Sequence, residues 1–452
     1  MNNNDSGLLS KNSIGQLLVS LSVPATAGMI AGALNNIMDA FYIGRVVGVD
    51  ALAGITVVFP VFLFVSACGQ GIGMGGAVLL SMSLGKGNLK KGEKYIGTIL
   101  ALSGVASLIL LGVSWIFREP ILKLLGASPH TLPWAREYFT FILPAWCLYI
   151  FSVTLSSAVR SEGKASRAMI SVFIGVVLNI ILDPLFLIVF KLGIKGAAIA
   201  ATISFASSVA YLLFYFYSGK SIWKLHMYNI SLKSTTVKEI LHFGISSFAR
   251  QIAGAFVNIV INNSIIKYGN YNTLAAFGIM NRIFSFLFMP LSGLAAGLQP
   301  ILGFCTGAHD GIRSSRAIRI SFIVATVYST LSFLILLLFA PVLTSFFNSN
   351  HDLIKEGSRT IRFASMGFSF IGFQVIATVV FLAAGKGITS LFLTLTRQVI
   401  ILIPLALILP LFFGRDGLWI SFSISDAVSF VIAAILVKFE VKKISEMKPE
   451  FD

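Results

Sequence analysis

Residues 30–37 read IAGALNNI, and residues 252–259 read IAGAFVNI. Six of these eight positions are identical at an offset of 222 residues. The same offset aligns further small residues along both halves, namely Gly71 with Gly293, Gly75 with Gly297, Gly85 with Gly307 and Gly163-Lys164 with Gly385-Lys386. A repeat that covers most of a chain decides its architecture. We therefore expect two copies of one structural unit.

The composition requires a lipid environment. Of the 452 residues, 56% are hydrophobic and only 12% are charged, about half the charged share of a soluble domain. A membrane span needs roughly 20 apolar residues. We predict an all-α polytopic membrane protein, with twelve transmembrane helices in two pseudo-symmetric six-helix bundles. The predicted spans are 17–41, 51–82, 96–117, 136–158, 168–190, 196–217, 242–266, 273–304, 318–347, 360–384, 388–412 and 417–437.

The basic residues set the orientation. A net charge of +16 would suggest a nucleic acid partner in a soluble protein, but membrane proteins collect Lys and Arg in their cytoplasmic loops. With the N-terminus inside, the inner segments contain 20 of these residues and the outer segments 11. We predict a multi-pass protein of the inner (plasma) membrane with both termini cytoplasmic and no nucleic acid partner. The first span follows a polar stretch without a cleavage motif and is expected to be retained.

The domain organisation follows from the repeat. Residues 1–217 form a predicted N-terminal six-helix lobe, residues 218–241 a cytoplasmic linker, residues 242–437 a C-terminal lobe and residues 438–452 a cytoplasmic tail. Each copy has an even number of spans, so both point the same way and are related by an axis along the membrane normal. Substrate is then expected between the lobes, with one lobe rocking against the other during transport.

Carboxylates inside a membrane are costly and usually functional. Of the 18 acidic residues, only Asp39, Asp183 and Asp426 lie well inside predicted spans. Asp39 and Asp183 map onto Ile261 and Leu405 in the second half, so ion coupling is expected in the first half alone. The alternative for both acids is a structural one, in which a hydrogen-bonded carboxyl group holds two helices together.

Amide and hydroxyl oxygens accompany these acids. Asn35 and Asn36 precede Asp39 by four and three residues, and Asn179 precedes Asp183 by four, which puts them on the same helix faces. Thr202 adds an oxygen in span six, and Pro24 can kink span one as a hinge. Such oxygens fit a proton site or a Na⁺ site, and the predicted coupling residues are Asp39, Asn36, Asn179, Asp183 and Thr202.

Polar and sulfur-containing side chains elsewhere suit a large amphipathic ligand, although helix packing explains each of them equally well. Arg282 is expected to pair with Asp426 or to meet an anionic part of a ligand. Arg250 and Arg397 lie near inner span ends and are expected to extend to the headgroups. The predicted substrate cavity comprises Asn35, Met38, Gln70, Met74, Gln251, Asn258, Asn262, Met280, Arg282, Gln299, Gln374 and Asp426.

At these residues the chain resembles the multidrug and toxic compound extrusion (MATE) family, in its DinF-like prokaryotic branch. The resemblance spans nearly the whole chain and rests on PATAGMIAGALNNIMDAFYIG (24–44), LNIILDPLF (178–186), Gln299-Pro300 and the glycine loops. It implies that Asp39, Asn179, Asp183 and Thr202 form a first-lobe proton or cation site and that Pro24 is a bending point. The NorM-like branch has carboxylates in spans seven and ten, where this chain has Gly254 and Gln374.

We therefore predict an antiporter that exports organic cations or amphipathic drugs, with H⁺ preferred over Na⁺ as the coupling ion. The alternative is a flippase for a lipid-linked or other amphipathic metabolite. An enzyme would need clustered His, Glu or Cys at nucleophile or metal spacing, which the sequence lacks, so none is predicted. No cofactor or resident metal is expected, and the protein is predicted to be a monomer.

Overall fold

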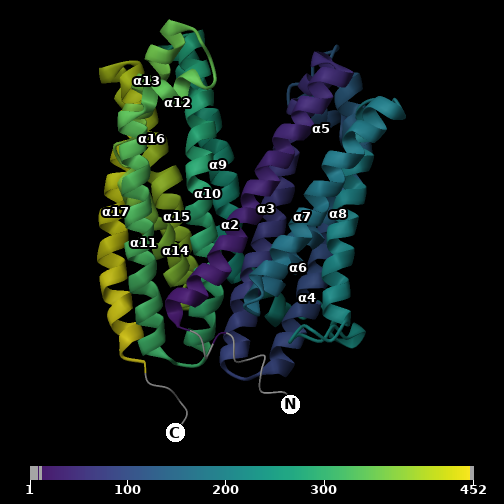
Figure 1. Cartoon of the computed structure of the whole chain (residues 1–452), viewed down its shortest axis with the longest axis vertical. Helices are drawn as coiled ribbons and strands as arrows, with labels where there is room; N and C mark the ends of the chain where they lie inside the picture. Colours follow the sequence, from purple (N-terminus) through teal and green to yellow (C-terminus); the bar gives the residue numbers. More distant parts are fainter. Residues whose placement is uncertain (1–8, 10–12, 448–452) are drawn as a thin grey trace. The chain divides into compact units, whose positions relative to one another are not determined.

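The chain is folded as a set of long helices (Figure 1). The structure, a computed structural model, describes residue 9 and residues 13–447. Within these residues there is no strand. Among the described residues, eleven helices are long and apolar enough to cross a membrane, and the number is twelve when the bent pair His351–Ser365 and Phe368–Ala383 is counted as one span. The predicted fold class is confirmed.

In the first half, the π-helical segments η1 and η2 extend the helices that carry the two predicted coupling acids. The elements are α2 (Ile14–Tyr42), η1 (Ile43–Val47), α3 (Val49–Gly85), α4 (Leu89–Ile116), α5 (Arg118–Leu124), α6 (Leu132–Ser161), α7 (Ala165–Pro184), η2 (Leu185–Val189) and α8 (Ile194–Tyr217).

In the second half, one π-helical segment interrupts the eleventh span. The elements are a short 3₁₀ turn η3 (Met227–Asn229), α9 (Ser234–Tyr268), α10 (Tyr271–Gly307), α11 (Gly311–Leu338), α12 (Ala340–Ser345), α13 (His351–Ser365), α14 (Phe368–Ala383), α15 (Gly387–Leu395), η4 (Thr396–Ile401), α16 (Leu402–Phe413) and α17 (Arg415–Ser445).

Predicted spans seven, nine, ten and twelve differ most from the structure. Span nine ends at Leu338 instead of residue 347, because Pro341 lacks the backbone N–H that would continue α11 and lies in the first turn of the separate helix α12. Span ten is bent by 48° between α13 and α14, next to Gly367. Helix α9 begins at Ser234, eight residues before the predicted span, and α17 continues to Ser445, into the predicted tail. The start of the predicted N-terminal stretch and the last five tail residues lie outside the described part.

The repeat predicted from sequence is visible in matching backbone conformations. Gly193 has φ 60° and ψ −147°, and Gly414, where the repeat offset is 221 residues, has φ 58° and ψ −142°. Only glycine adopts such angles readily. Gly163 and Gly385 also share a positive φ, at 79° and 85°. The two halves therefore turn their chains in the same way at equivalent positions.

The chain forms two compact units whose limits differ from the two halves of the sequence. One unit contains residues 23–251, and the other contains residues 13–22 together with the chain from Ile252 onward. The first turns of α2 thus belong with the second half, and the first turns of α9 belong with the first half. Pro24 lies just beyond the point at which α2 changes unit, inside a continuous helix.

Glycines make this exchange possible. A Cβ on Gly75 would lie 2.2 Å from the carbonyl oxygen of Ile240 in α9, and one on Gly297 would lie 2.4 Å from Ser22 Oγ in α2. Gly75 and Gly297 are repeat partners, so the same close helix contact is made once in each unit. Small residues at such positions are what membrane helices use to approach closely.

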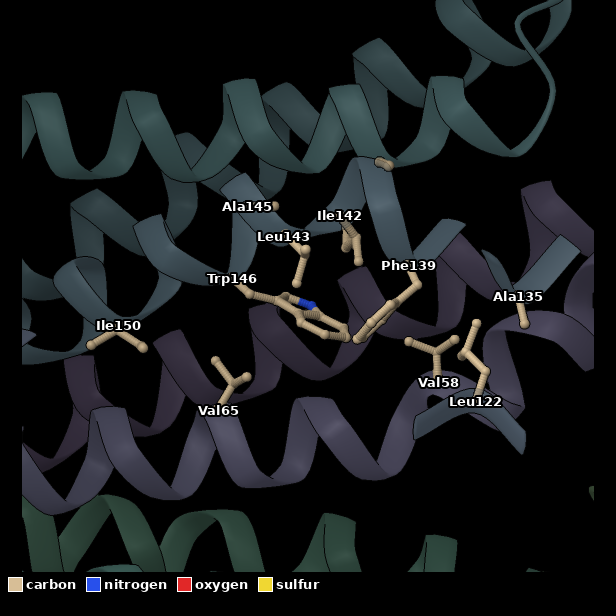
Figure 2. Close-up of a cluster of buried hydrophobic side chains, with 11 residues drawn as sticks. Val58, Val65, Leu122, Ala135, Phe139, Ile142, Leu143, Ala145, Trp146 and Ile150 are labelled. Carbon is tan, nitrogen blue, oxygen red and sulfur yellow. The ribbon is translucent and has the colours of Figure 1, made fainter. Parts of the chain in front are cut away.

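Aromatic and branched side chains fill the interior of the first unit. Figure 2 shows Phe139 and Trp146 of α6 between Val58 and Val65 of α3, with Leu122 of α5 beside them. The rings of Phe139 and Trp146 meet edge to face at 5.9 Å. Their positions are nearly or fully closed to solvent. This core fixes α3 against α6, the helix pair that supports the candidate site.

The segment after α8 is fixed by Glu162, which lies at the end of α6 and outside the spans. Its buried carboxyl group accepts hydrogen bonds from the Tyr215 hydroxyl at 3.0 Å, from the Ile222 backbone N–H at 3.3 Å and from the Ser221 hydroxyl. Burial raises the pKa of Glu162 to about 7, while these hydrogen bonds and Lys164 act in the opposite direction. Residues 218–222 are therefore held by a group that titrates near neutral pH.

This raised pKa predicts that folding stability falls as pH rises. The folded protein keeps the Glu162 proton up to about pH 7 while an unfolded chain loses it near pH 4.5, so stability is lost across that window. The loss is roughly 3 kcal/mol in the absence of other titrations. In Glu162→Gln, melting temperatures measured from pH 4.5 to 8 should depend less on pH. A variant with the same pH dependence as the wild type would contradict this assignment.

Candidate functional site

Four side chains in the first unit form a continuous hydrogen-bonded chain between α2 and α7. Asn35 Nδ2 lies 3.3 and 3.4 Å from the two carboxylate oxygens of Asp39, and it donates to Asn179 Oδ1 at 2.6 Å. Asn179 Nδ2 in turn donates to Asp183 Oδ1 at 3.3 Å. Two amides thus connect the two acids predicted from sequence. We call Asp39, Asn35, Asn179 and Asp183 the acid cluster.

Local helix geometry explains this arrangement. Asn35 and Asp39, like Asn179 and Asp183, are four residues apart, so each pair shares one helix face. The chain then leaves the α-helical pattern on both sides, in η1 after α2 and in η2 after Pro184. Ile43 of η1 and Leu187 of η2 pack in one buried apolar cluster. Single π-turns are frequent at functional sites.

The acid cluster is largely buried, with Asn35 and Asp39 half-buried, and some of its acceptors have no hydrogen-bond partner. The exposed fraction is 3% for Asn179 and 1% for Asp183. Asn35 Oδ1 and Asp183 Oδ2 are both buried, and neither has a hydrogen-bond partner among the residues that the structure describes. Buried acceptors of this kind are rare unless something else occupies them. A proton on a carboxyl oxygen, or a small cation, would supply what is missing.

The two carboxyl groups also act on each other directly. Asp39 and Asp183 lie close enough for their negative charges to repel one another. Within the described chain, neither acid forms an ion pair with Lys or Arg. Two like charges in a low dielectric repel strongly. The cluster can therefore hold a proton, and losing it creates charge that nothing nearby neutralises.

Tyr138 of α6 was not singled out from the sequence. Its hydroxyl lies close enough to Asp39 and Asp183 to interact electrostatically with both. Its ring packs in the apolar cluster around Ile43 and Leu187. A tyrosine within an apolar span is a weak signal by itself, since its ring is equally suited to packing. It became recognisable only when the fold placed α6 beside both acids.

Two predicted members of the site lie outside the cluster. Asn36 is exposed, and its amide donates to the backbone oxygen of Gly32 at 3.1 Å. Its three-residue spacing from Asp39 rotates it away from the face that Asn35 shares with the acid. The Thr202 hydroxyl donates to the backbone oxygen of Ala198 at 2.8 Å, on its own helix. Within the part of the chain that the structure describes, neither side chain forms a hydrogen bond with a carboxyl group of the cluster.

In the second unit, Asp426 pairs with Arg397, whose Nε lies 2.6 Å from Asp426 Oδ1. The predicted Asp426–Arg282 pair is therefore wrong, and Arg282 is exposed. The prediction that Arg397 extends to the headgroups is wrong as well, because it turns inward to this carboxylate. The π-segment η4 contains Arg397 and displaces it from the regular helical register. The pair borders a cavity that also includes Asn258 and Gln398.

The other residues of the predicted substrate cavity are scattered. Gln70 and Gln251 both donate to the Ser66 hydroxyl in the first unit, at 3.4 and 3.2 Å. Met280 is fully buried as part of the packing, and Asn262 is exposed. The remaining members divide between buried amides and half-buried methionines. Gln299 is buried, Gln374 is buried and donates to the Asp426 backbone oxygen at 2.6 Å, and Met38 and Met74 are half-buried.

A family model described as MatE matches residues 24–185 and again 247–408. These two matches cover most of the chain and coincide with the two copies of the repeat. The chain belongs to the MATE family. Proteins of the MATE family are transporters, and with its apolar helices this MATE protein is a multi-pass membrane protein.

Individual relatives agree with this membership. The chain is 26% identical to a FAD transporter of Shewanella oneidensis, over 93% of both chains. It is 23% identical to the multidrug export protein MepA of Staphylococcus aureus, over 94% of both chains. A crystal structure of MATE in complex with MaL6 superposes with a TM-score of 0.91, covering 99% of this MATE chain and all of that one at 22% identity.

The different surroundings of the two buried acids predict opposite stability effects. At pH 8, Asp183→Asn should raise the melting temperature of the purified protein by several degrees, because it removes a charge that has no counter-ion while keeping the acceptor for Asn179. Asp426→Asn should lower it by a similar amount, because Arg397 then loses its partner. Thermal denaturation in detergent measures both. Destabilisation by both variants alike would show that the acid cluster is a packing device.

Proposed function

We propose that this MATE protein is an antiporter that exports organic cations or amphipathic drugs in exchange for protons that enter through the acid cluster. The observation that supports it most is the pair of buried acceptors, Asn35 Oδ1 and Asp183 Oδ2, in a cluster with two acids and no counter-ion among the described residues. Such a group can exist with or without its proton, and the two states differ in charge.

The orientation of the amides favours H⁺ over Na⁺. Asn35 and Asn179 present N–H groups to the two carboxyl groups. Sodium prefers oxygen ligands, and to use more of them than the free Asn35 Oδ1 and Asp183 Oδ2 it would need these amides to give up their hydrogen bonds. A proton needs no such rearrangement. No organic cofactor is part of the proposal, and Na⁺ remains the competing coupling ion that transport assays separate.

Coupling requires that the proton changes the packing of α2. The Asn35–Asn179 bond attaches α2 to α7. Charging both acids would add repulsion across this junction, and protonation would remove it. The two states of α2 would then bias the transporter toward different conformations in an alternating-access cycle. Pro24 is proposed as the hinge for this movement.

The charge bias of the loops supports a location in the inner membrane with both termini in the cytoplasm. We propose a monomer, because each copy of the repeat already supplies the counterpart that a second subunit would otherwise provide.

Loss of either acid should uncouple transport. In vesicles with an imposed pH gradient, Asp183→Asn and Asp39→Asn should reduce gradient-driven export of a fluorescent organic cation at least about tenfold, the effect expected when an essential protonation step is removed. Thr202→Val is the matched control and should retain most of the activity, because that hydroxyl bonds to its own helix. Two outcomes would contradict the proposal. One is efflux driven by the pH gradient that persists in Asp183→Asn, and the other is efflux driven by a Na⁺ gradient alone.

The FAD transporter among the relatives supports a second candidate, export of an amphipathic metabolite. The same vesicles distinguish the two candidates by substrate. A drug exporter should transport several unrelated organic cations but not FAD. A metabolite exporter should transport FAD but not the cations. Competition between FAD and a cation for the same efflux would show that one protein does both.

A further inference from the structure

The second unit contains a cavity of about 180 Å³ that the acid cluster does not share. Its walls come from α9, α10, α16, α17 and the π-segment η4. A cavity of about 150 Å³ is large enough for benzene. The space therefore fits a group the size of one substituted ring, or several water molecules. We call it the second-unit cavity.

Its charges cancel. Arg397 and Asp426 are the only charged residues among those that line it, and they pair with each other at 2.6 Å. The Asp426 side chain is 5% exposed and that of Arg397 is 26% exposed. An added ion of either sign would leave an unbalanced charge at low dielectric, which is costly. The second-unit cavity is therefore suited to an uncharged group.

Its polar atoms leave one kind of donor and one kind of acceptor available. Arg397 uses Nε on Asp426, while an arginine has five N–H donors in all. Gln398 Oε1 is buried and accepts no hydrogen bond from any residue in the described chain. Rotation of the terminal amide of glutamine is nearly free, so this oxygen can turn toward the cavity. A carbonyl oxygen would complement the guanidinium, and an N–H group would complement Gln398.

The apolar walls favour a flat ring. Phe277 and Phe422 line the cavity, and Phe277 is itself stacked on Trp419 at 6.0 Å and 22°. Asn281 donates to Asn258 at 3.1 Å, and Asn258 donates to the Gly254 backbone oxygen at 3.0 Å, so both amides are already oriented. Aromatic walls contribute stacking that does not depend on ligand charge.

We propose that the second-unit cavity is a ligand site for a planar, uncharged, ring-sized group that carries a carbonyl oxygen beside an N–H, as cyclic amides and imides do. Arg397 donates to the carbonyl oxygen, Gln398 accepts from the N–H, and the phenylalanine rings contact the faces of the ring. The second-unit cavity and the acid cluster share no residue, so this proposal can be tested independently of proton coupling.

A substitution at one glycine can fill the second-unit cavity. A Cβ on Gly254, which lines the cavity, would meet nothing within 4 Å, so Gly254→Leu should fill the space without disturbing the helix. Gly278 on the neighbouring helix α10 is equally open, does not line the cavity and provides the matched control Gly278→Leu. Gln398→Met removes the unpaired acceptor at nearly constant size.

Saturation-transfer NMR on the purified full-length protein tests the proposal with thymine as the probe. Thymine should bind the wild type and Gly278→Leu equally, and binding should weaken at least about tenfold in Gly254→Leu and in Gln398→Met. 1,3-Dimethylthymine, which has lost both N–H groups, should bind about tenfold less tightly than thymine to the wild type.

Two further probes of similar size, benzoate and benzylammonium, identify the preferred charge. Thymine binding that is unaffected by Gly254→Leu would overturn the proposal. So would benzoate or benzylammonium that binds more tightly than thymine and is displaced by Gly254→Leu, since the cavity would then select an ion. Thermal denaturation confirms that each variant is folded, and Gln398→Met is expected to melt at or above the wild-type temperature because a buried, unpaired oxygen is removed.

Discussion

The hydrogen bond from Asn35 to Asn179 Oδ1 joins the helix that carries Asp39 to the helix that carries Asp183. Together with the apolar contact between Ile43 and Leu187, it holds α2 against α7 and brings the two carboxyl groups into one region. Burial makes this junction sensitive to protonation, because ionising a carboxyl group inside the membrane costs much more free energy than ionising it in water. A single proton can therefore shift the balance between two arrangements of α2.

The acid cluster belongs to one copy of the internal repeat, because the other copy has Ile261 and Leu405 in place of Asp39 and Asp183. The two copies turn their chains at equivalent glycines, and each gives the first turns of its first helix to the opposite unit. Their buried acids have diverged. In the first unit Asp39 and Asp183 are accompanied by amides, whereas in the second unit Asp426 is neutralised by Arg397. A site that is already neutral is poorly suited to ion coupling and better suited to holding an uncharged ligand group.

The sequence predicted the helices, the repeat and three of the four residues of the acid cluster as coupling residues, because hydropathy and four-residue spacing are local properties. It placed Asn35 in the substrate cavity instead, since Asn35 and Asn36 both precede Asp39 by about one turn and only the fold shows which one faces α7. The partner of Asp426 depended on the π-segment that turns Arg397 inward, and no spacing rule indicates such a segment. Tyr138 was missed because its role arises from the packing of α6 beside α2 and α7.

Proton release on substrate binding tests the central claim most directly. Purified protein in weakly buffered detergent solution is mixed with a transported cation, and the pH change gives the number of protons released per molecule. We expect the wild-type protein to release protons and the Asp39→Asn/Asp183→Asn double variant to release none. Both proteins should still bind the cation. The same release from the double variant, or none from the wild type, would contradict it.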